Sequence, residues 1–523
     1  MKVVFSGGLN ENQYPSIFEA AKGSYNFTLS KDSTALKPRA PFDLKGTAPN
    51  AGNVGGLMQL ITRANAVTTL VQAANTIYSW DGASTFTSVG TCATSSQLRD
   101  VYWSLNDYIV ITDLTKQTVV QKWTGSGTVT NITTGLGVDL YAKYAVVWRN
   151  RTWLFNVKTS TDTPHLFVAS AFENPQSYDI TLRATHTSFT SGNEAFYMLS
   201  PDLRPINGAC VFYDQLIVST EGGKLFRVTG TDSTNYAVEE FYPQSNAIGP
   251  DSLVNGGDDI FYMKQGGAIE SLISTQRFGD IQTDDLSRYI PDSTSGLTSC
   301  YSVYDQEKQT VNFFTGEKVL VLHKNLLKDG GLIDNKGSKV RVSPWSVYKT
   351  QHASGFSTSA VKYLRIPGGT AYSVYFGDSS GRVFDLNGTG LSGDGGTSAI
   401  QVNRSTRVIT AEDGKKLMRH VTRGTIEFRR MNQVSVSIDL DWSDEYASST
   451  ANVTLNGATA LTIGAYFGGS IYFSGSSYFS QGFEFLDRVS HKNFSSVGKG
   501  PGCILTVTTE DNLSYQIENI TLD

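Results

Sequence analysis

One unit returns through the middle of this chain, and its clearest copy is Leu105-Asn106-Asp107-Tyr108-Ile109-Val110-Ile111. It consists of two apolar β-type runs that meet at an Asn or Asp hinge. Further copies are Trp148-Arg149-Asn150-Arg151-Thr152-Trp153-Leu154-Phe155 and Phe212-Tyr213-Asp214-Gln215-Leu216-Ile217-Val218, and others centre on Asp258 and Asp305. The hinge positions 106, 150, 214, 258 and 305 are separated by steps of 44, 64, 44 and 47 residues. Repeats of this length, each holding several short strands, are typical of a β-propeller.

Composition supports an all-β fold. Only 17% of the 523 residues are charged, whereas the chain has 50 glycines, 25 tyrosines and 27 phenylalanines. Aromatic strands joined by glycine-containing turns produce such numbers. Counting weaker units at both ends, we expect six to seven blades, with one blade closed by segments that are distant in sequence.

Three domains follow from changes of pattern along the chain. Residues 1–57 show little periodicity and are expected to form an extended N-terminal arm. Residues 58–400 form the propeller, with loop insertions near 170–205 and 324–365. Residues 401–523 are expected to form a β-sandwich-like platform domain, because Val434, Val436, Ile438, Leu440 and Trp442 alternate with polar residues as in a half-buried strand.

The arm is a candidate contact segment for a neighbouring subunit or an adaptor. Three prolines fall within twelve residues, at 38, 41 and 49, and proline lacks the amide donor that a central strand needs. An extended segment gains contacts by lying on another surface. The candidate contact residues are Asn26, Phe27, Pro38, Arg39, Pro41, Phe42 and Asp43.

A basic stripe stands out near the start of the third domain. It has three readings: a solvated face, a docking surface for an acidic partner or an adjacent subunit, or a DNA contact whose affinity would fall steeply with salt. Its residues are Arg404, Arg407, Lys415, Lys416, Arg419, Arg423, Arg429 and Arg430. The carboxylates that follow could ligate calcium or form a solvated acidic edge. They are Asp439, Asp441, Asp444 and Glu445.

Catalytic motifs are missing from the sequence, so we predict that the chain is not an enzyme and uses no cofactor or metal. The six histidines are isolated, and phosphate-binding loops and nucleophile elbows are absent. Ser392-Gly393-Asp394-Gly395-Gly396-Thr397 is the nearest match to a glycosidase Asp-box, but it lacks the tryptophan. The four cysteines lie far apart and are expected to be buried thiols. The aromatic residues of the blades could offer a carbohydrate platform, although packing between blades is the favoured reading.

The formal net charge of −5 argues against clamping of nucleic acid, while a mildly acidic surface lets DNA pass without sticking. No apolar run reaches the length of a membrane span.

Several segments together resemble the tail nozzle, or hub, proteins of short-tailed bacteriophages. They are Asn26-Phe27-Thr28-Leu29, the run from Leu36 to Ala48, Leu98-Arg99-Asp100-Val101-Tyr102-Trp103-Ser104, and Asp202-Leu203-Arg204-Pro205-Ile206-Asn207-Gly208. The resemblance implies a virion structural protein, assembled in the host cytoplasm as a ring of identical subunits, with six as the expected number. Such a ring sits below the head–tail adaptor, carries tail fibres or spikes, and encloses the channel through which double-stranded DNA is ejected. No catalytic residues are implied. The alternative is a receptor- or carbohydrate-binding propeller at the tail periphery.

Overall fold

The computed structural model describes the chain apart from residues 1, 6, 13–18, 31–32, 133–137, 179–190, 244, 273–283, 329–331, 334–338, 341, 351–354, 389–393, 395–399, 407–408, 411–418, 422–423, 430–433, 443–448, 456–488, 495–497, 501, 512–515 and 523. It divides into two compact units. The propeller unit comprises Asp43–Val319 and Ser354–Asn387, and the two-sheet unit comprises Met1–Phe42, Leu320–Ala353 and Gly388–Asp523.

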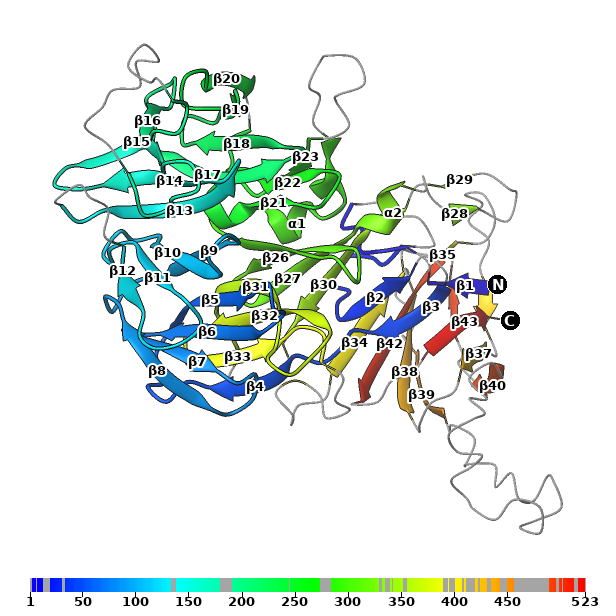
Figure 1. The fold of residues 1–523 in the computed structure, drawn as a ribbon. Coiled ribbons are helices and arrows are strands. Elements are labelled where there is room, and N and C mark those ends of the chain that lie inside the picture. Colours follow the sequence, from blue (N-terminus) through cyan, green and yellow to red (C-terminus); the bar gives the residue numbers. More distant parts are fainter. Residues whose placement is uncertain are drawn as a thin grey trace, which may run out of the picture. The chain divides into compact units, whose positions relative to one another are not determined.

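The propeller unit is built from four-stranded antiparallel sheets that follow one another along the chain (Figure 1). Blade 1 is β5 (Val54–Ile61), β6 (Val67–Ala73), β7 (Thr76–Trp80) and β8 (Phe86–Thr91); blade 2 is β9 (Leu98–Trp103), β10 (Tyr108–Asp113), β11 (Gln121–Trp123) and β12 (Thr130–Asn131); blade 3 is β13 (Tyr141–Trp148), β14 (Arg151–Lys158), β15 (Asp162–Ala169) and β16 (Phe196–Leu199); blade 4 is β17 (Ile206–Phe212), β18 (Gln215–Thr220), β19 (Leu225–Thr229) and β20 (Ala237–Tyr242).

The second half of the ring is less regular. Blade 5 is β21 (Leu253–Asn255), β22 (Ile260–Met263), β23 (Ile269–Ser271) and β24 (Asp284–Asp285); blade 6 begins with β25 (Tyr301–Asp305), β26 (Thr310–Thr315) and β27 (Lys318–His323); blade 7 is β31 (Thr358–Arg365), β32 (Tyr372–Asp378), β33 (Arg382–Asp385) and β4 (Asp43–Thr47). Short helices precede β21 and β25: η2 (Pro250–Ser252), η4 (Leu286–Tyr289) and α1 (Pro291–Thr294).

The seven blades close into a ring. The first strand of each blade packs against the first strand of the next, in the order β5, β9, β13, β17, β21, β25, β31, and β31 packs against β5. Blade 7 takes its fourth strand from far earlier in the chain, because β4 pairs antiparallel with β33. The structure therefore confirms the all-β propeller and the closure of one blade by segments distant in sequence.

The predicted hinges are the turns between the first and second strands of successive blades. Trp148 pairs with Arg151 and Phe212 with Gln215, so both turns contain two residues. All four turn residues are left-handed, with φ of 50° and 54° at Arg149 and Asn150 and of 44° and 57° at Tyr213 and Asp214. Positive φ at both positions defines the type I′ turn, whose twist matches that of the flanking strands.

Hydrophobic side chains fill the spaces between neighbouring blades. One cluster joins blades 2 and 3 through residues such as Trp103 and Leu154, and another joins blades 3 and 4 around Trp153 and Tyr236. The five aromatic residues considered as a sugar platform are all buried, as the packing interpretation predicted. They are Trp103, Trp123, Trp148, Trp153 and Phe155.

The two-sheet unit holds the predicted sandwich-like domain. One sheet contains β34 (Ile400–Ser405), β42 (Gly502–Asp511), β38 (Val434–Trp442) and β39 (Ser449–Leu455), with β35 (Ile409–Thr410) on β42; the other contains β2 (Phe27–Ser30), β3 (Ser33–Pro38), β43 (Gln516–Leu522), β37 (Gly424–Arg429) and β40 (Val489–Phe494), with β1 (Lys2–Val4) on β43. Smaller elements are α2 (Lys324–Lys328), β28 (Leu332–Ile333), β29 (Lys339–Val340), β30 (Trp345–Lys349), β36 (Arg419–Val421) and β41 (Gly498–Gly500).

The N-terminal segment is extended, as expected, but it is hydrogen bonded as strands. β1 and β3 pair with β43 in the two-sheet unit, while β4 completes a propeller blade. Proline disfavours the middle of a central strand but not the end of a strand, and Pro38 is the last residue of β3, so the prolines did not rule these strands out.

Candidate functional site

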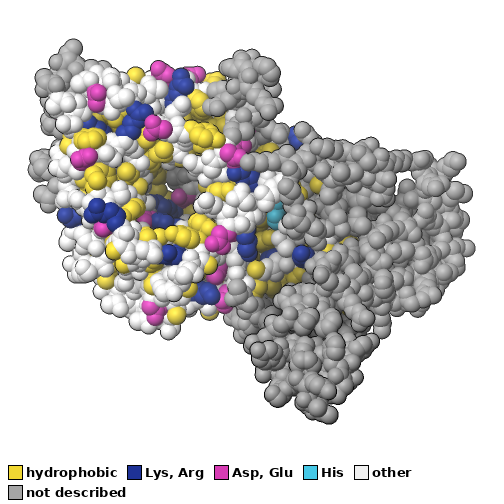
Figure 2. Space-filling model, turned by 45° about the vertical axis from the view of Figure 1, so that its right-hand side comes forward, with side chains coloured by type: hydrophobic (Ala, Val, Ile, Leu, Met, Phe, Trp, Pro, Cys, Tyr) yellow, Lys and Arg dark blue, Asp and Glu magenta, His cyan; other side chains and the backbone are white. Residues whose placement is uncertain are grey.

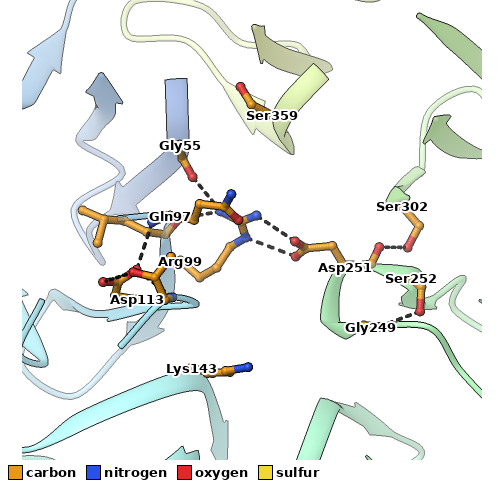
Figure 3. A network of polar contacts seen from close by, with 12 residues as sticks. Gly55, Gln97, Arg99, Asp113, Lys143, Gly249, Asp251, Ser252, Ser302 and Ser359 are labelled. Carbon is orange, nitrogen blue, oxygen red and sulfur yellow. Dashed lines mark hydrogen bonds and ion pairs between the residues drawn. The ribbon is translucent and has the colours of Figure 1, made fainter. Parts of the chain in front are cut away.

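An ion pair spans the axis of the propeller. Arg99 lies on β9, the first strand of blade 2, and Asp251 lies in η2, immediately before the first strand of blade 5. Nε of Arg99 donates to Oδ1 of Asp251 over 3.1 Å, and Nη2 donates to Oδ2 over 2.7 Å (Figure 3). Because blades 2 and 5 are not neighbours in the ring, this two-pronged contact bridges the space that the first strands enclose.

Backbone groups hold both partners. Nη1 of Arg99 donates to the carbonyl of Gly55 on blade 1 over 2.8 Å, and the carbonyl of Asp251 accepts from Oγ of Ser302 on blade 6 over 2.5 Å. Gly55 must be small, because a Cβ there would lie 2.5 Å from the Ser96 carbonyl oxygen. The pair thus ties together four blades and keeps 21% and 22% of its two side chains exposed.

A second ion pair links the first strands of blades 2 and 7, and a hydrogen bond connects it to the first strand of blade 1. Oδ2 of Asp100 accepts from the backbone N–H of Gln59 over 3.1 Å, and Oδ1 forms an ion pair with Nζ of Lys362 on blade 7. Asp100 is the residue next to Arg99, so side chains on opposite faces of β9 serve the two pairs. The Asp100 contacts join blades 1, 2 and 7, and the Arg99–Asp251 pair crosses the axis.

Arg99, Tyr144 and Cys300 keep their ordinary charge states at neutral pH. Burial opposes the charge of Arg99, but the Asp251 carboxylate outweighs it and the pKa of Arg99 is raised. Burial raises the pKa of Tyr144, and Asp251 and Glu221 add to that effect. Burial and Asp251 likewise raise the pKa of the Cys300 thiol. The phenol and the thiol therefore stay protonated, which is the unreactive form of a cysteine.

Polar side chains at the blade junctions form a further set of clamps. Oε1 of Gln72 accepts from the N–H of Leu98 over 3.2 Å, joining blades 1 and 2. Nδ2 of Asn156 donates to the carbonyl of Ile206, joining blades 3 and 4. Asp113, at the end of β10, accepts from the backbone N–H groups of residues 97, 115, 117 and 118. These side chains satisfy backbone N–H and carbonyl groups that the blade edges would otherwise leave buried without a partner.

Four of the predicted arm residues converge inside the two-sheet unit. Arg39 is 2% exposed and forms a two-pronged pair with Asp394, 2.8 Å and 2.5 Å long. Nε of Arg39 donates to Oδ1 of Asn26 over 2.9 Å, and the guanidinium lies 3.8 Å from the centre of the Phe42 ring. Phe27 is fully buried. Contact of the arm with a partner stays a prediction, and these four side chains are committed to contacts within their own chain.

The other arm residues are half-buried: Pro38 ends β3, Pro41 follows it, and Asp43 begins β4 with an ion pair to Lys45. Asp394, considered earlier in a possible Asp-box, instead neutralises Arg39.

The structure describes only part of the basic stripe. Arg404 is buried between the rings of Phe5 and Phe27, and its Nη2 donates to the Gly7 carbonyl. Burial lowers the pKa of Arg404 to about 9. Arg404 therefore does not belong to a solvated face. Arg419 and Arg429 lie in β36 and β37, without described side chains, and the remaining members lie outside the described residues: Arg407, Lys415, Lys416, Arg423 and Arg430.

The acidic group is also described in part. Asp439 is half-buried on β38, Asp441 lies on the same strand, and Asp444 and Glu445 lie outside the described residues. Among the residues that the structure describes, no group of three or more His, Cys, Asp or Glu side chains could hold a metal ion. Of the cysteines, Cys300 is buried, whereas Cys92 and Cys210 are half-buried, so the expectation of full burial is wrong for those two.

Charges of both signs share the described surface. Figure 2 shows a hollow bordered by hydrophobic side chains, with Lys or Arg and Asp or Glu side chains nearby. A phosphate-binding cleft would be lined by positive charge. Within the helices that the structure describes, none is long and apolar enough to cross a membrane.

Sequence reasoning did not find the axial pair. Arg99 and Asp100 lie in a segment that carries the family resemblance, but nothing in the sequence connects Arg99 with Asp251, 152 residues away. The sequence offers only a weak signal for such a pair, namely that the charged residues Arg99 and Asp100 stand at the start of a repeat unit in an otherwise apolar strand.

The fold and the axial site define a seven-bladed β-propeller protein. No family model and no curated protein matches the chain. Solved structures that are similar include a streptogramin B lyase (12% identity, TM-score 0.39, 66% of this chain and 92% of that one) and YCF48 from Cyanidioschyzon merolae (10%, 0.38, 66% and 98%). A third is BBS1N in complex with ARL6DN (9%, 0.41, 66% and 96%). Because these TM-scores are low, the propeller fold is assigned from the strand pairing of the chain itself.

Proposed function

We propose that the chain is a virion structural protein that forms the tail nozzle ring of a short-tailed bacteriophage. The observation that carries the proposal is the sequence resemblance, spread over the N-terminal segment and two blade junctions in the order found in nozzle proteins. In this role the chain forms a ring of identical subunits, six by the resemblance, below the head–tail adaptor. The ring encloses the channel for the double-stranded DNA genome and carries fibres or spikes.

Two features of the chain support this role. The Arg99–Asp251 pair bridges the propeller axis, so a channel for a duplex has to be built between subunits and not within one propeller. The propeller then serves as a rigid building block, whose edges are satisfied within the ring of blades. The net charge of −5 suits a wall past which DNA moves without being held.

The alternative is a receptor- or carbohydrate-binding propeller at the tail periphery. One observation favours it: Tyr213 exposes 62% of its surface on a turn of the propeller. Tyrosine and tryptophan are the residues that most often supply exposed contact area for a partner.

Immunogold labelling of phage particles tests the proposal, with antibody against this chain and negative-stain microscopy. Gold at the tail, directly beneath the head, is the expected result. Label at the fibre tips would replace the nozzle by the receptor-binding role. Particles without label, with the antigen free in the lysate, would contradict both roles.

A further inference from the structure

The Tyr213 turn holds an exposed aromatic ring in a left-handed backbone conformation. Among the described residues, six large hydrophobic side chains are exposed, and Tyr213 has the highest exposed fraction, 62%. It occupies the first position of the β17–β18 turn with φ of 44°, where glycine or asparagine is the ordinary choice. A left-handed conformation costs a tyrosine about 1–2 kcal/mol. Turn formation alone does not account for an exposed aromatic ring at this position.

The turn is held rigidly by its neighbours. The Tyr213 ring lies 4.4 Å, centre to centre, from the buried ring of Phe212. Nε1 of Trp148 donates to the carbonyl of Asp214 over 3.1 Å, and Nη2 of Arg149 donates to Oδ2 of the same residue over 2.9 Å. The Arg149 guanidinium is itself stacked 4.8 Å from the centre of the Trp148 ring. The blade 3 turn therefore supports the blade 4 turn.

A carboxylate and a guanidinium accompany the ring. The Asp214 side chain is 72% exposed, and its Oδ2 accepts the hydrogen bond from Nη2 of Arg149. The hydrogen bond from Arg149 lowers the pKa of Asp214, so the carboxylate is ionised across the physiological range. Nη1 of Arg149 donates to the Gly230 carbonyl, which fixes the guanidinium in place. An aromatic ring, a carboxylate and a guanidinium thus lie together on this pair of turns.

This combination matches the chemistry of a sugar ring. The C–H face of a pyranose is apolar and packs on an aromatic ring, while its hydroxyl groups donate to a carboxylate and accept from a guanidinium. A rigid platform avoids the entropy loss of ordering side chains on binding. We propose that Tyr213, Asp214 and Arg149 form a contact site for a pyranose, with the Tyr213 ring as the stacking platform. The site does not depend on the nozzle role.

Saturation-transfer difference NMR on the full chain tests the site. The probes are methyl glycosides of glucose, galactose, rhamnose and N-acetylglucosamine, and a purified bacterial O-antigen polysaccharide. We expect transfer to the ring protons of at least one probe. Tyr213→Ala should weaken binding at least about tenfold, whereas Tyr213→Phe should change it by no more than about threefold, since the ring supplies the contact.

Leu203→Ala is the matched control. Leu203 is 61% exposed and precedes β17, at the opposite end of the strand from Tyr213, so its loss should leave binding unchanged. Transfer to the polysaccharide alone would assign the site to surface glycans, and transfer to the methyl glycosides as well would assign it to the sugar unit itself. Absence of transfer from every probe, or transfer that survives Tyr213→Ala in a protein with an unchanged Tm, would overturn the proposal.

Discussion

Asp113 shows how much one carboxylate can hold together in this fold. It is fully buried at the end of β10, and its carboxylate accepts hydrogen bonds from four backbone N–H groups and from the hydroxyl of Ser96. Burial raises its pKa, but the hydrogen bonds from Gln97, Thr115 and Thr118 outweigh burial, and the pKa is lowered from its ordinary value of 3.8. The stabilisation is therefore complete above about pH 5, well above the unfolded-state pKa, and is lost as the pH falls through the folded-state pKa.

We expect Asp113→Asn to lower the free energy of unfolding at pH 7 by about 2–3 kcal/mol, because an amide nitrogen cannot accept the bonds that a carboxylate oxygen receives. The variant should also lose less stability than the wild type between pH 5 and 3. Urea unfolding followed by tryptophan fluorescence at both pH values measures this. An identical acid dependence in the two proteins would show that Asp113 does not titrate as described.

The axial pair calls for a double-mutant cycle. Arg99→Ala or Asp251→Ala leaves a partly buried charge without its partner, so each should lower the free energy of unfolding by about 2–3 kcal/mol. The double variant should cost less than the sum of the two, with a coupling of about 1–2 kcal/mol. The surface pair Arg227–Glu239, 39% and 48% exposed, is the control, and its coupling should stay near about 0.5 kcal/mol or below. Equal coupling in the two cycles would show that the axial pair is not a structural tie.

At the scale of the element, β4 is the strand that closes the ring. It pairs with β33, and Gly46 lies where a Cβ would be 2.3 Å from the carbonyl oxygen of Ala83. Gly46→Ala must therefore shift the backbone of the closing strand. We expect a loss of about 2 kcal/mol in the free energy of unfolding, within the range of overpacked interiors. Gly249→Ala is the control, because a Cβ there meets nothing within 4 Å. Similar thermal melts for the two variants would contradict a tight fit of β4.

Hairpins could be predicted from the sequence because their signals are local. The Asn and Asp hinges are confirmed, and so is the alternation of buried and half-buried side chains over residues 436–439 of β38. The N-terminal strands and the axial pair could not be predicted from the sequence, because they depend on which distant segments of the chain pair with one another. Pro38 and Pro41 indicated an extended chain but not its partners, β43 and β33. Arg39 looked like an arm residue until its pairing with Asp394, 355 residues away, placed it in the core.

At the scale of the whole molecule, the proposed role requires a wall that does not retain DNA. The chain carries 43 Lys and Arg residues against 48 Asp and Glu residues. At the propeller axis, Arg99 and Lys362 are paired with carboxylates, so their positive charges are neutralised and do not attract phosphate groups. Non-specific DNA binding depends on phosphate neutralisation and on the release of counterions. A mildly acidic subunit lacks that driving force, so the ring that we propose would guide a duplex without a binding site for it.

We therefore expect no retardation of a double-stranded DNA fragment in a gel-shift assay with about 10 µM chain at about 150 mM salt, because non-specific binding needs clustered positive charge. The basic stripe provides the opposing hypothesis. If DNA is retarded, and Lys415→Glu with Lys416→Glu abolishes the shift, the stripe contacts DNA and the expectation of free passage is wrong. Asp439→Lys serves as the matched control, since it adds a positive charge on β38 outside the stripe. A shift that appears only in this control would show that the natural charge balance keeps the DNA free.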